Sequence, residues 1–147
     1  NSLSDGDINA SQDAAMQKQR QEYGQRGIAL AHFDKDTDLP HLVNIDQDPF
    51  RNKRLMYFLK PSGTVFGSEG DVQLFGLDVA GCHCRIYFSE ATTADGTGSD
   101  HTTGRWVLEN RNGVTFHNGR ELQLGDHVSL SCYDRIVMAG EITLFVD

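Results

Sequence analysis

The chain has 147 residues, of which 38% are hydrophobic and 9% aromatic, and it carries 13 Lys plus Arg against 21 Asp plus Glu, a net charge of −8. A chain of this length buries roughly two-thirds of its unfolded surface, which leaves room for one domain and an arm. The acidic balance argues against nucleic acid as a partner. Because no apolar run approaches the ~20 residues of a membrane helix, we expect no insertion into a bilayer.

Residues 1–27 are predicted to form an N-terminal arm that is partly helical or disordered. Strong helix formers fill Ser11–Tyr23, and Gly24 and Gly27 would end that helix. A helix this short and polar is marginal alone in water, so a partner chain is the expected packing surface. Since the chain starts without a Met, we expect it to be a fragment of a longer protein.

Residues 28–54 are predicted to form a connector, in which acidic residues and two prolines recur. The Asp34-x-Asp36-x-Asp38 triplet fails as a calcium loop, because its sixth position is Leu39 and its twelfth is Ile45. Between two prolines, residues 40–49 are predicted to be extended. The nearby basic residues are interpreted as a solvated face rather than a nucleic-acid site.

From Leu55 onward the chain is predicted to be all-β. Short runs of β-branched and aromatic residues alternate with Gly turns and with no helical repeat, which is typical of a sandwich or barrel. A polar insert, Ala91–Gly104, is expected to be a mobile surface loop. The strands should supply the following core residues: Cys84, Ile86, Phe88, Trp106, Leu108, Phe116, Val128, Ile136 and Leu144.

Cys82-His83-Cys84 resembles a metal-ligand run, but alternation along a strand turns His83 away from both cysteines. We therefore predict no metal, with Cys84 in the core and His83 bonded to loop backbone. The three cysteines, an odd number, indicate a reducing compartment. Neither a phosphate-cradling Gly loop nor a hydrolase motif is present, so no cofactor and no enzymatic activity are predicted.

Gly67, Asp71-Val72, His83 and Asn118-Gly119 together resemble the pattern of a forkhead-associated domain. The entry segment, residues 40–49, and the strand that follows it are similar to those of the kinesin-3 motors. The resemblance covers about residues 28–147, which would be the forkhead-associated domain, and makes residues 1–27 part of a neck or coiled-coil region. It implies an all-β sandwich of the forkhead-associated type with a short N-terminal helical arm.

The resemblance further implies a non-catalytic module of a cytoplasmic microtubule motor whose ATPase head lies outside this chain. Its partners would be proteins: an adaptor, a cargo or a second kinesin chain, with a homodimer through the N-terminal arm as one form. The module would contribute to dimerisation, autoinhibition or cargo binding. A phosphothreonine-peptide reader is the alternative function.

The family pattern places an Arg, a Ser and an Asn at the phosphate, whereas this chain has Ser68, Ala80 and Gly113 there. A charge-assisted hydrogen bond is worth roughly 1.5–3 kcal/mol, so the missing Arg alone would weaken phosphate binding tenfold or more. Binding without phosphate is therefore predicted. The predicted recognition positions are Ser68, Ala80, Gly81, Arg111, Asn112, Gly113 and Asn118, with Gly67, His83 and Gly119 in structural roles.

Overall fold

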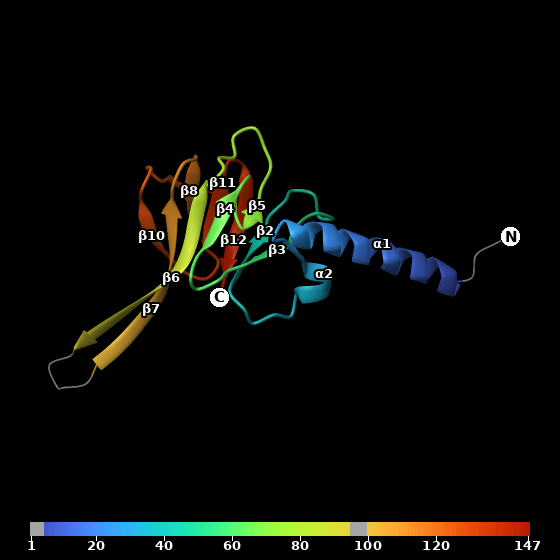
Figure 1. Cartoon of the computed structure of the whole chain (residues 1–147), viewed down its shortest axis with the longest axis horizontal. Coiled ribbons are helices and arrows are strands. Elements are labelled where there is room, and N and C mark those ends of the chain that lie inside the picture. Colours follow the sequence, from blue (N-terminus) through green and yellow to red (C-terminus); the bar gives the residue numbers. More distant parts are fainter. Residues whose placement is uncertain (1–4, 95–99) are drawn as a thin grey trace.

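The computed structural model describes residues 5–94 and 100–147, and it folds residues 29–147 into two packed sheets (Figure 1). The larger sheet has seven strands in the order β1-β3-β2-β12-β11-β8-β9, and the smaller has five in the order β10-β7-β6-β4-β5. The predicted all-β sandwich with an N-terminal helix is confirmed. The elements are α1 (Asp5–Gln25), β1 (Ala29–Leu30), α2 (Ala31–Asp34), β2 (His41–Asn44), β3 (Leu55–Phe58), β4 (Thr64–Gly67), β5 (Val72–Gln73), β6 (Cys84–Ala94), β7 (Asp100–Asn110), β8 (Thr115–His117), β9 (Arg120–Glu121), β10 (His127–Leu130), β11 (Arg135–Met138) and β12 (Glu141–Val146).

The core lies between the two sheets, and most strands bury side chains there, as period-2 alternation allows. Phe66, Ile86 and Leu108 of the smaller sheet have no exposed surface, and the same holds for Ile136 of the larger sheet. The predicted core residues Cys84 and Trp106 are also buried, while Phe88 and Val128 are half-buried and pack against the core. These contacts fix how the sheets face each other.

Two predicted core residues, Phe116 and Leu144, are only half-buried. Their neighbours Thr115 and Thr143 point inward instead. Each threonine hydroxyl donates a buried hydrogen bond, Thr115 to Asn110 Oδ1 at 2.7 Å and Thr143 to the Ile136 carbonyl at 2.9 Å. Hydrophobicity alone gave the wrong register, because these satisfied hydroxyls can occupy inward positions.

The expected mobile loop at Ala91–Gly104 is wrong for the described part of that segment. Strands β6 and β7 stay paired as far as Ala94 and Asp100, so the hairpin projects beyond the sandwich as a two-stranded ribbon (Figure 1). Threonines favour extended, paired backbone, a preference that the polar composition concealed. At the base of the ribbon, the Phe88 ring lies over Gly104 and 5.3 Å from the Trp106 ring.

Helix α1 extends away from the sandwich on the side opposite the ribbon and contacts the sheets near its C-terminal end (Figure 1). There Arg26 Nη2 donates to the Gln73 carbonyl at 3.0 Å, and the Gln73 amide donates back to the Arg26 carbonyl at 2.9 Å. The Arg26 guanidinium also stacks 4.6 Å from the Phe75 ring. These contacts attach the arm to β5, at the edge of the smaller sheet.

Candidate functional site

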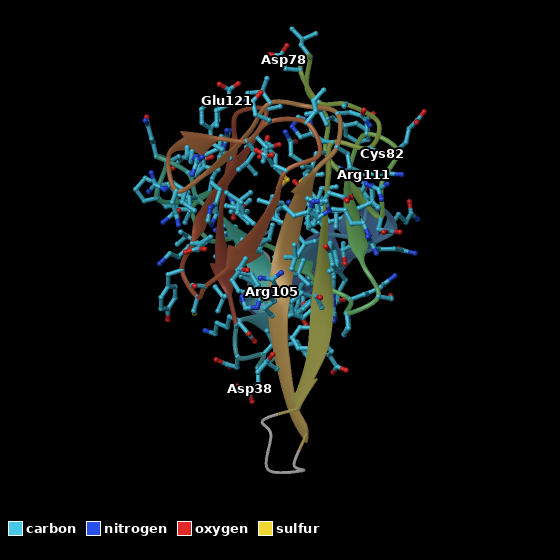
Figure 2. All side chains as sticks on the ribbon, turned by 90° about the vertical axis from the view of Figure 1, so that its left-hand side faces the viewer. Asp38, Asp78, Cys82, Arg105, Arg111 and Glu121 are labelled. Atoms are coloured by element: carbon cyan, nitrogen blue, oxygen red, sulfur yellow. The ribbon has the colours of Figure 1, made fainter. Side chains whose placement is uncertain are left out.

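Three connections meet at one end of the sandwich and are called here the recognition loops: residues 68–71, 74–83 and 111–114. The Ser68 amide donates to the Ala80 carbonyl at 3.0 Å, and the Glu69 amide donates to the Gly81 carbonyl at 3.0 Å. Asn112 Nδ2 donates to the Cys82 carbonyl at 3.1 Å, and Cys82 lies beside Arg111 at this end (Figure 2). The structure therefore brings together Ser68, Ala80, Gly81, Arg111, Asn112 and Gly113.

His83 links two of the recognition loops, residues 74–83 and 111–114, from below. Its ring is fully buried, and Nδ1 accepts a hydrogen bond from the Ala80 amide at 3.2 Å. The other ring nitrogen, Nε2, must then carry the proton, and it donates to the Val114 carbonyl at 2.9 Å. The His83 carbonyl accepts from the amides of Arg111 and Asn112 at 3.1 and 3.2 Å. The His83 ring and its own backbone thus hold these two loops in one arrangement.

Two glycines allow this close approach. A Cβ on Gly67 would overlap the carbonyl oxygens of Ala80 and Gly81, and a Cβ on Gly113 would overlap the His83 ring. Both contacts are with atoms that other bonds fix in place, so a side chain at either position would separate the loops. The requirement at Gly67 and Gly113 is therefore one of space.

Electrostatics at the loops do not favour an anion. The Arg111 guanidinium donates to Glu109 Oε1 at 2.6 Å, and His127 Nε2 lies 2.8 Å from the other oxygen of the same carboxylate. The hydrogen bond from Arg111 holds the pKa of Glu109 below its ordinary value, and the same bond raises the pKa of Arg111. The Glu69 carboxylate lies against Gly81, which puts negative charge beside the loop. Arg111 is therefore already neutralised by a carboxylate.

Asn118 and Gly119 lie in a different network. Both have left-handed backbone, with φ of 50° and 84°, and they form the tight turn between β8 and β9. The Asn118 side chain accepts from the Arg135 amide at 2.8 Å and donates to Asp134 Oδ1 at 3.1 Å. Within the described residues, Asn118 has no hydrogen bond to the recognition loops. Asn118 therefore holds the β8–β9 turn against residues 134 and 135, and it lies away from the other predicted binding positions.

Sequence reasoning missed Asn110, a fully buried polar residue at the end of β7. Its side-chain nitrogen Nδ2 donates to the Leu122 carbonyl at 3.3 Å, and its Oδ1 accepts from the Thr115 hydroxyl. Its carbonyl accepts from the Gly125 amide at 2.7 Å. An Asn that ends an apolar strand just before Arg-Asn-Gly was the available signal. Asn110 joins the β7–β8 loop to the β9–β10 connection.

The described part of the chain contains no group of three or more His, Cys, Asp or Glu side chains placed to hold a metal. Cys82, Cys84 and Cys132 are free thiols. Burial raises the pKa of the Cys84 thiol, whose sulfur contacts Met138 Sδ at 3.0 Å in the core. In the residues that the structure describes, no helix has the length and apolar character needed to cross a bilayer.

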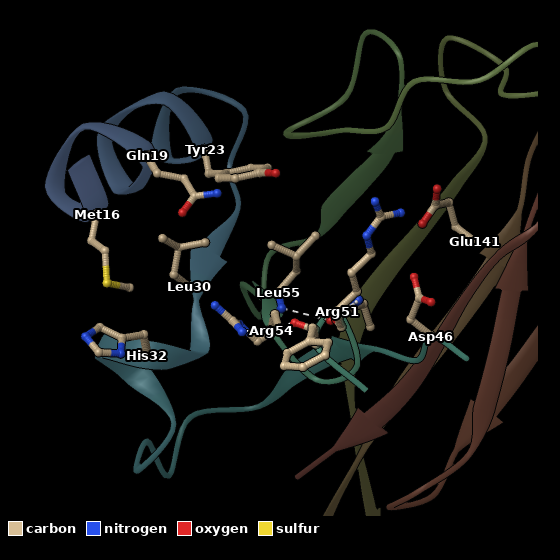
Figure 3. A pocket seen from close by; sticks show the side chains of 12 residues that line it. Met16, Gln19, Tyr23, Leu30, His32, Asp46, Arg51, Arg54, Leu55 and Glu141 are labelled. Carbon is tan, nitrogen blue, oxygen red and sulfur yellow. Dashed lines mark hydrogen bonds between the residues drawn. The ribbon is translucent and has the colours of Figure 1, made fainter. Parts of the chain in front are cut away.

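A second concave region lies between the arm and the sandwich, with a volume of about 470 Å³ (Figure 3). Met16, Gln19 and Tyr23 of α1 form one wall, and Arg54 and Leu55 form part of the other. Its mixed lining, with cations and carboxylates facing the same space, selects no ligand chemistry.

Comparison with known proteins shows which proteins the chain resembles in sequence. No protein-family model matches the chain. The human kinesin-like protein KIF14 is 31% identical over 123 residues, which cover 78% of this chain and 7% of KIF14. The kinesin-like protein unc-104 of Caenorhabditis elegans is 28% identical over 128 residues, covering 76% of the chain and 8% of that protein. The chain spans less than a tenth of the length of these relatives.

Among solved structures, the MEK1 forkhead-associated domain matches with a TM-score of 0.56 at 15% identity, covering 78% of this chain and 94% of that one. The yeast Dun1 forkhead-associated domain, solved with a doubly phosphorylated peptide, matches with a TM-score of 0.55 at 23% identity and covers 77% of each chain. The chain thus has the fold of a forkhead-associated domain, and it is similar in sequence to kinesin-like proteins over 78% of its length.

In this forkhead-associated domain, Ser68 and Ala80 occupy the positions for which the family pattern predicted an Arg and a Ser. The backbone of both residues is engaged between the loops, since the Ser68 amide donates to the Ala80 carbonyl. These two loops therefore meet through their backbones, and the Arg and Ser side chains of the family pattern are absent at positions 68 and 80.

Proposed function

We propose that this forkhead-associated domain is a non-catalytic protein-interaction module of a kinesin-like microtubule motor, and that it binds its partner without a phosphothreonine. The observation that carries the proposal is the charge at the recognition loops. Ser68 replaces the expected cation, Arg111 is paired with Glu109, and the Glu69 carboxylate lies against Gly81. A phosphate would approach one compensated cation and an uncompensated carboxylate.

The partner is an adaptor, a cargo or a second kinesin chain in the cytoplasm, at the microtubule cytoskeleton. Similarity to kinesin-like proteins supports this setting, although the chain matches 7% of KIF14. The motor activity belongs to the parent protein, outside this chain. Dimerisation through α1 is part of the proposal, because the helix exposes most of its described side chains. Deletion of residues 1–27 should then weaken self-association in a solution mass measurement.

The alternative is a phosphothreonine reader, favoured by the Dun1 and MEK1 relatives solved with phosphorylated peptides. The two functions separate in one experiment. An array of paired peptides, each with threonine or phosphothreonine, should give signals that do not depend on the phosphate. Consistent binding of only the phosphorylated member of each pair would establish the alternative.

A further inference from the structure

Next to the recognition loops lies a groove of about 610 Å³, formed by the β7–β8 loop, the β9–β10 connection and the β11–β12 turn. Its lining includes Asn112 and Gly113, but neither Ser68, Ala80 nor Arg111. Asp78 and Glu121 line it and lie near each other at the loop end of the molecule (Figure 2). This surface is called the acidic groove below.

The acidic groove has an apolar floor open to solvent. Val114 is 50% exposed and Leu124 is 69% exposed, and both line the groove. Leu77, adjacent to Asp78, is fully exposed at 105%. Large aliphatic side chains grouped in this way on a concave surface are characteristic of an interaction site, whereas isolated ones are common on any surface.

The carboxylates at the groove are unpaired. Within the described residues, the side chains of Asp78 and Glu121 have neither a hydrogen bond nor an ion pair, and no Lys or Arg lines the groove. At the neighbouring recognition loops, by contrast, Glu109 is neutralised by Arg111. The groove therefore combines apolar surface with uncompensated negative charge.

The walls of the groove are held rigidly. The Val114 carbonyl accepts from His83 Nε2 at 2.9 Å and from the Ala139 amide at 3.1 Å. Asn110 holds the Leu122 carbonyl, and the Gln123 amide donates to Asp126 Oδ2 at 2.8 Å. A surface that is already ordered loses little conformational entropy on binding.

We infer that the acidic groove binds an unphosphorylated peptide segment in which a large apolar side chain is followed or preceded by Lys or Arg. The apolar side chain would lie against Val114 and Leu124, and the cation would pair with Asp78 or Glu121. This inference rests on the proposed function and adds the chemistry of the partner. An anionic membrane or a phosphopeptide would instead meet these two carboxylates and the chain's net charge of −8.

The test is selection of short random unphosphorylated peptides displayed on phage against the whole chain, followed by titration of the synthesised peptides. The selected peptides should share an apolar residue beside Lys or Arg. Asp78→Lys, Glu121→Lys and Leu124→Ser should each weaken binding about tenfold, since each removes a charge partner or apolar contact. Asp38→Lys is the matched control, because Asp38 lies at the opposite end of the molecule (Figure 2). All four substituted residues are exposed, and circular dichroism would verify the fold of every variant.

The outcomes are distinct. The inference is supported if the selected peptides share an apolar residue beside Lys or Arg, and if the three groove variants bind them more weakly while Asp38→Lys binds them as the wild type does. Peptides that bind equally well to the groove variants would overturn it and leave the proposed function standing. Selection of no peptide, or of acidic peptides, would also overturn it. If the selection gave no peptide and the paired array gave binding only to phosphothreonine peptides, the proposed function would be overturned as well.

Discussion

The ring of His83 lies directly against Gly113, with no room between them for a methyl group. The ring cannot move aside, because Ala80 and Val114 hold both of its nitrogens. This packing makes the spacing of two recognition loops depend on a missing side chain.

Gly113→Ala should therefore destabilise the domain by about 1–3 kcal/mol, the usual cost of overpacking a buried site. Chemical denaturation would measure the loss. Gly76→Ala is the matched control, since a Cβ at Gly76 would meet only ordinary van der Waals contact with Val79. Equal stability of the two variants would contradict the close packing of His83 on Gly113.

Asp134 should make the stability of the domain depend on acidity. Burial by itself would raise the pKa of Asp134, but hydrogen bonds from the Ser131 amide, His117 and Asn118 together lower it. A carboxylate whose folded-state pKa is lowered stabilises the fold above its unfolded pKa of about 3.9, and that contribution is lost as the pH falls through the folded value.

Asp134→Asn should accordingly cost about 1–2 kcal/mol at pH ~7, and its difference from the wild type should shrink below pH ~4. Urea denaturation across this range would measure both. Asp38→Asn, at an exposed residue, is the control and should change little at any pH. A difference that stays constant with pH would show that the ionised carboxylate is not what stabilises the β8–β9 turn.

Arg26 should determine how firmly the arm is attached. In Arg26→Ala the bond to the Gln73 carbonyl and the stacking on Phe75 are lost, so the last turn of α1 should exchange its amide hydrogens faster. Arg26→Lys should fail to restore protection, because an ammonium lacks the planar stacking surface. Lys18→Ala, at an exposed residue of the same helix, is the control. Unchanged exchange in Arg26→Ala would mean that other contacts hold the arm.

The sequence predicted the fold class because alternation and Gly turns recur along residues 55–147, and these signals are local. It misplaced Phe116 and Leu144 because their neighbours Thr115 and Thr143 satisfy their hydroxyls through Asn110 and Ile136, which reach them only once the chain has turned back after β7 and β11. The family pattern correctly predicted that six of the seven recognition positions lie together. Asn118 is the exception, because its bonds to Asp134 and Arg135 depend on the pairing of β8 with β11. The Glu109–Arg111 pair was missed because Arg111 lies just beyond the end of β7, where strand alternation no longer predicts the direction of a side chain.

Restoring the missing side chains should restore phosphate binding. The double variant Ser68→Arg with Ala80→Ser adds a cation and a hydroxyl at two loop positions whose backbones are hydrogen-bonded to each other. Because charge-assisted hydrogen bonds are worth roughly 1.5–3 kcal/mol, affinity for a phosphothreonine peptide should rise tenfold or more over its threonine counterpart. Adding Glu69→Gln should raise it further, since that carboxylate lies against Gly81 and would compete for the new guanidinium. Fluorescence anisotropy with the paired peptides would measure both steps, with Glu69→Gln alone as the control for removal of the charge.

If the triple variant discriminated no better than the wild type, the loop backbone rather than the replaced side chains would be what excludes phosphate. Tight phosphate-dependent binding by the wild type would instead contradict the premise that Ser68 and Ala80 prevent phosphate binding.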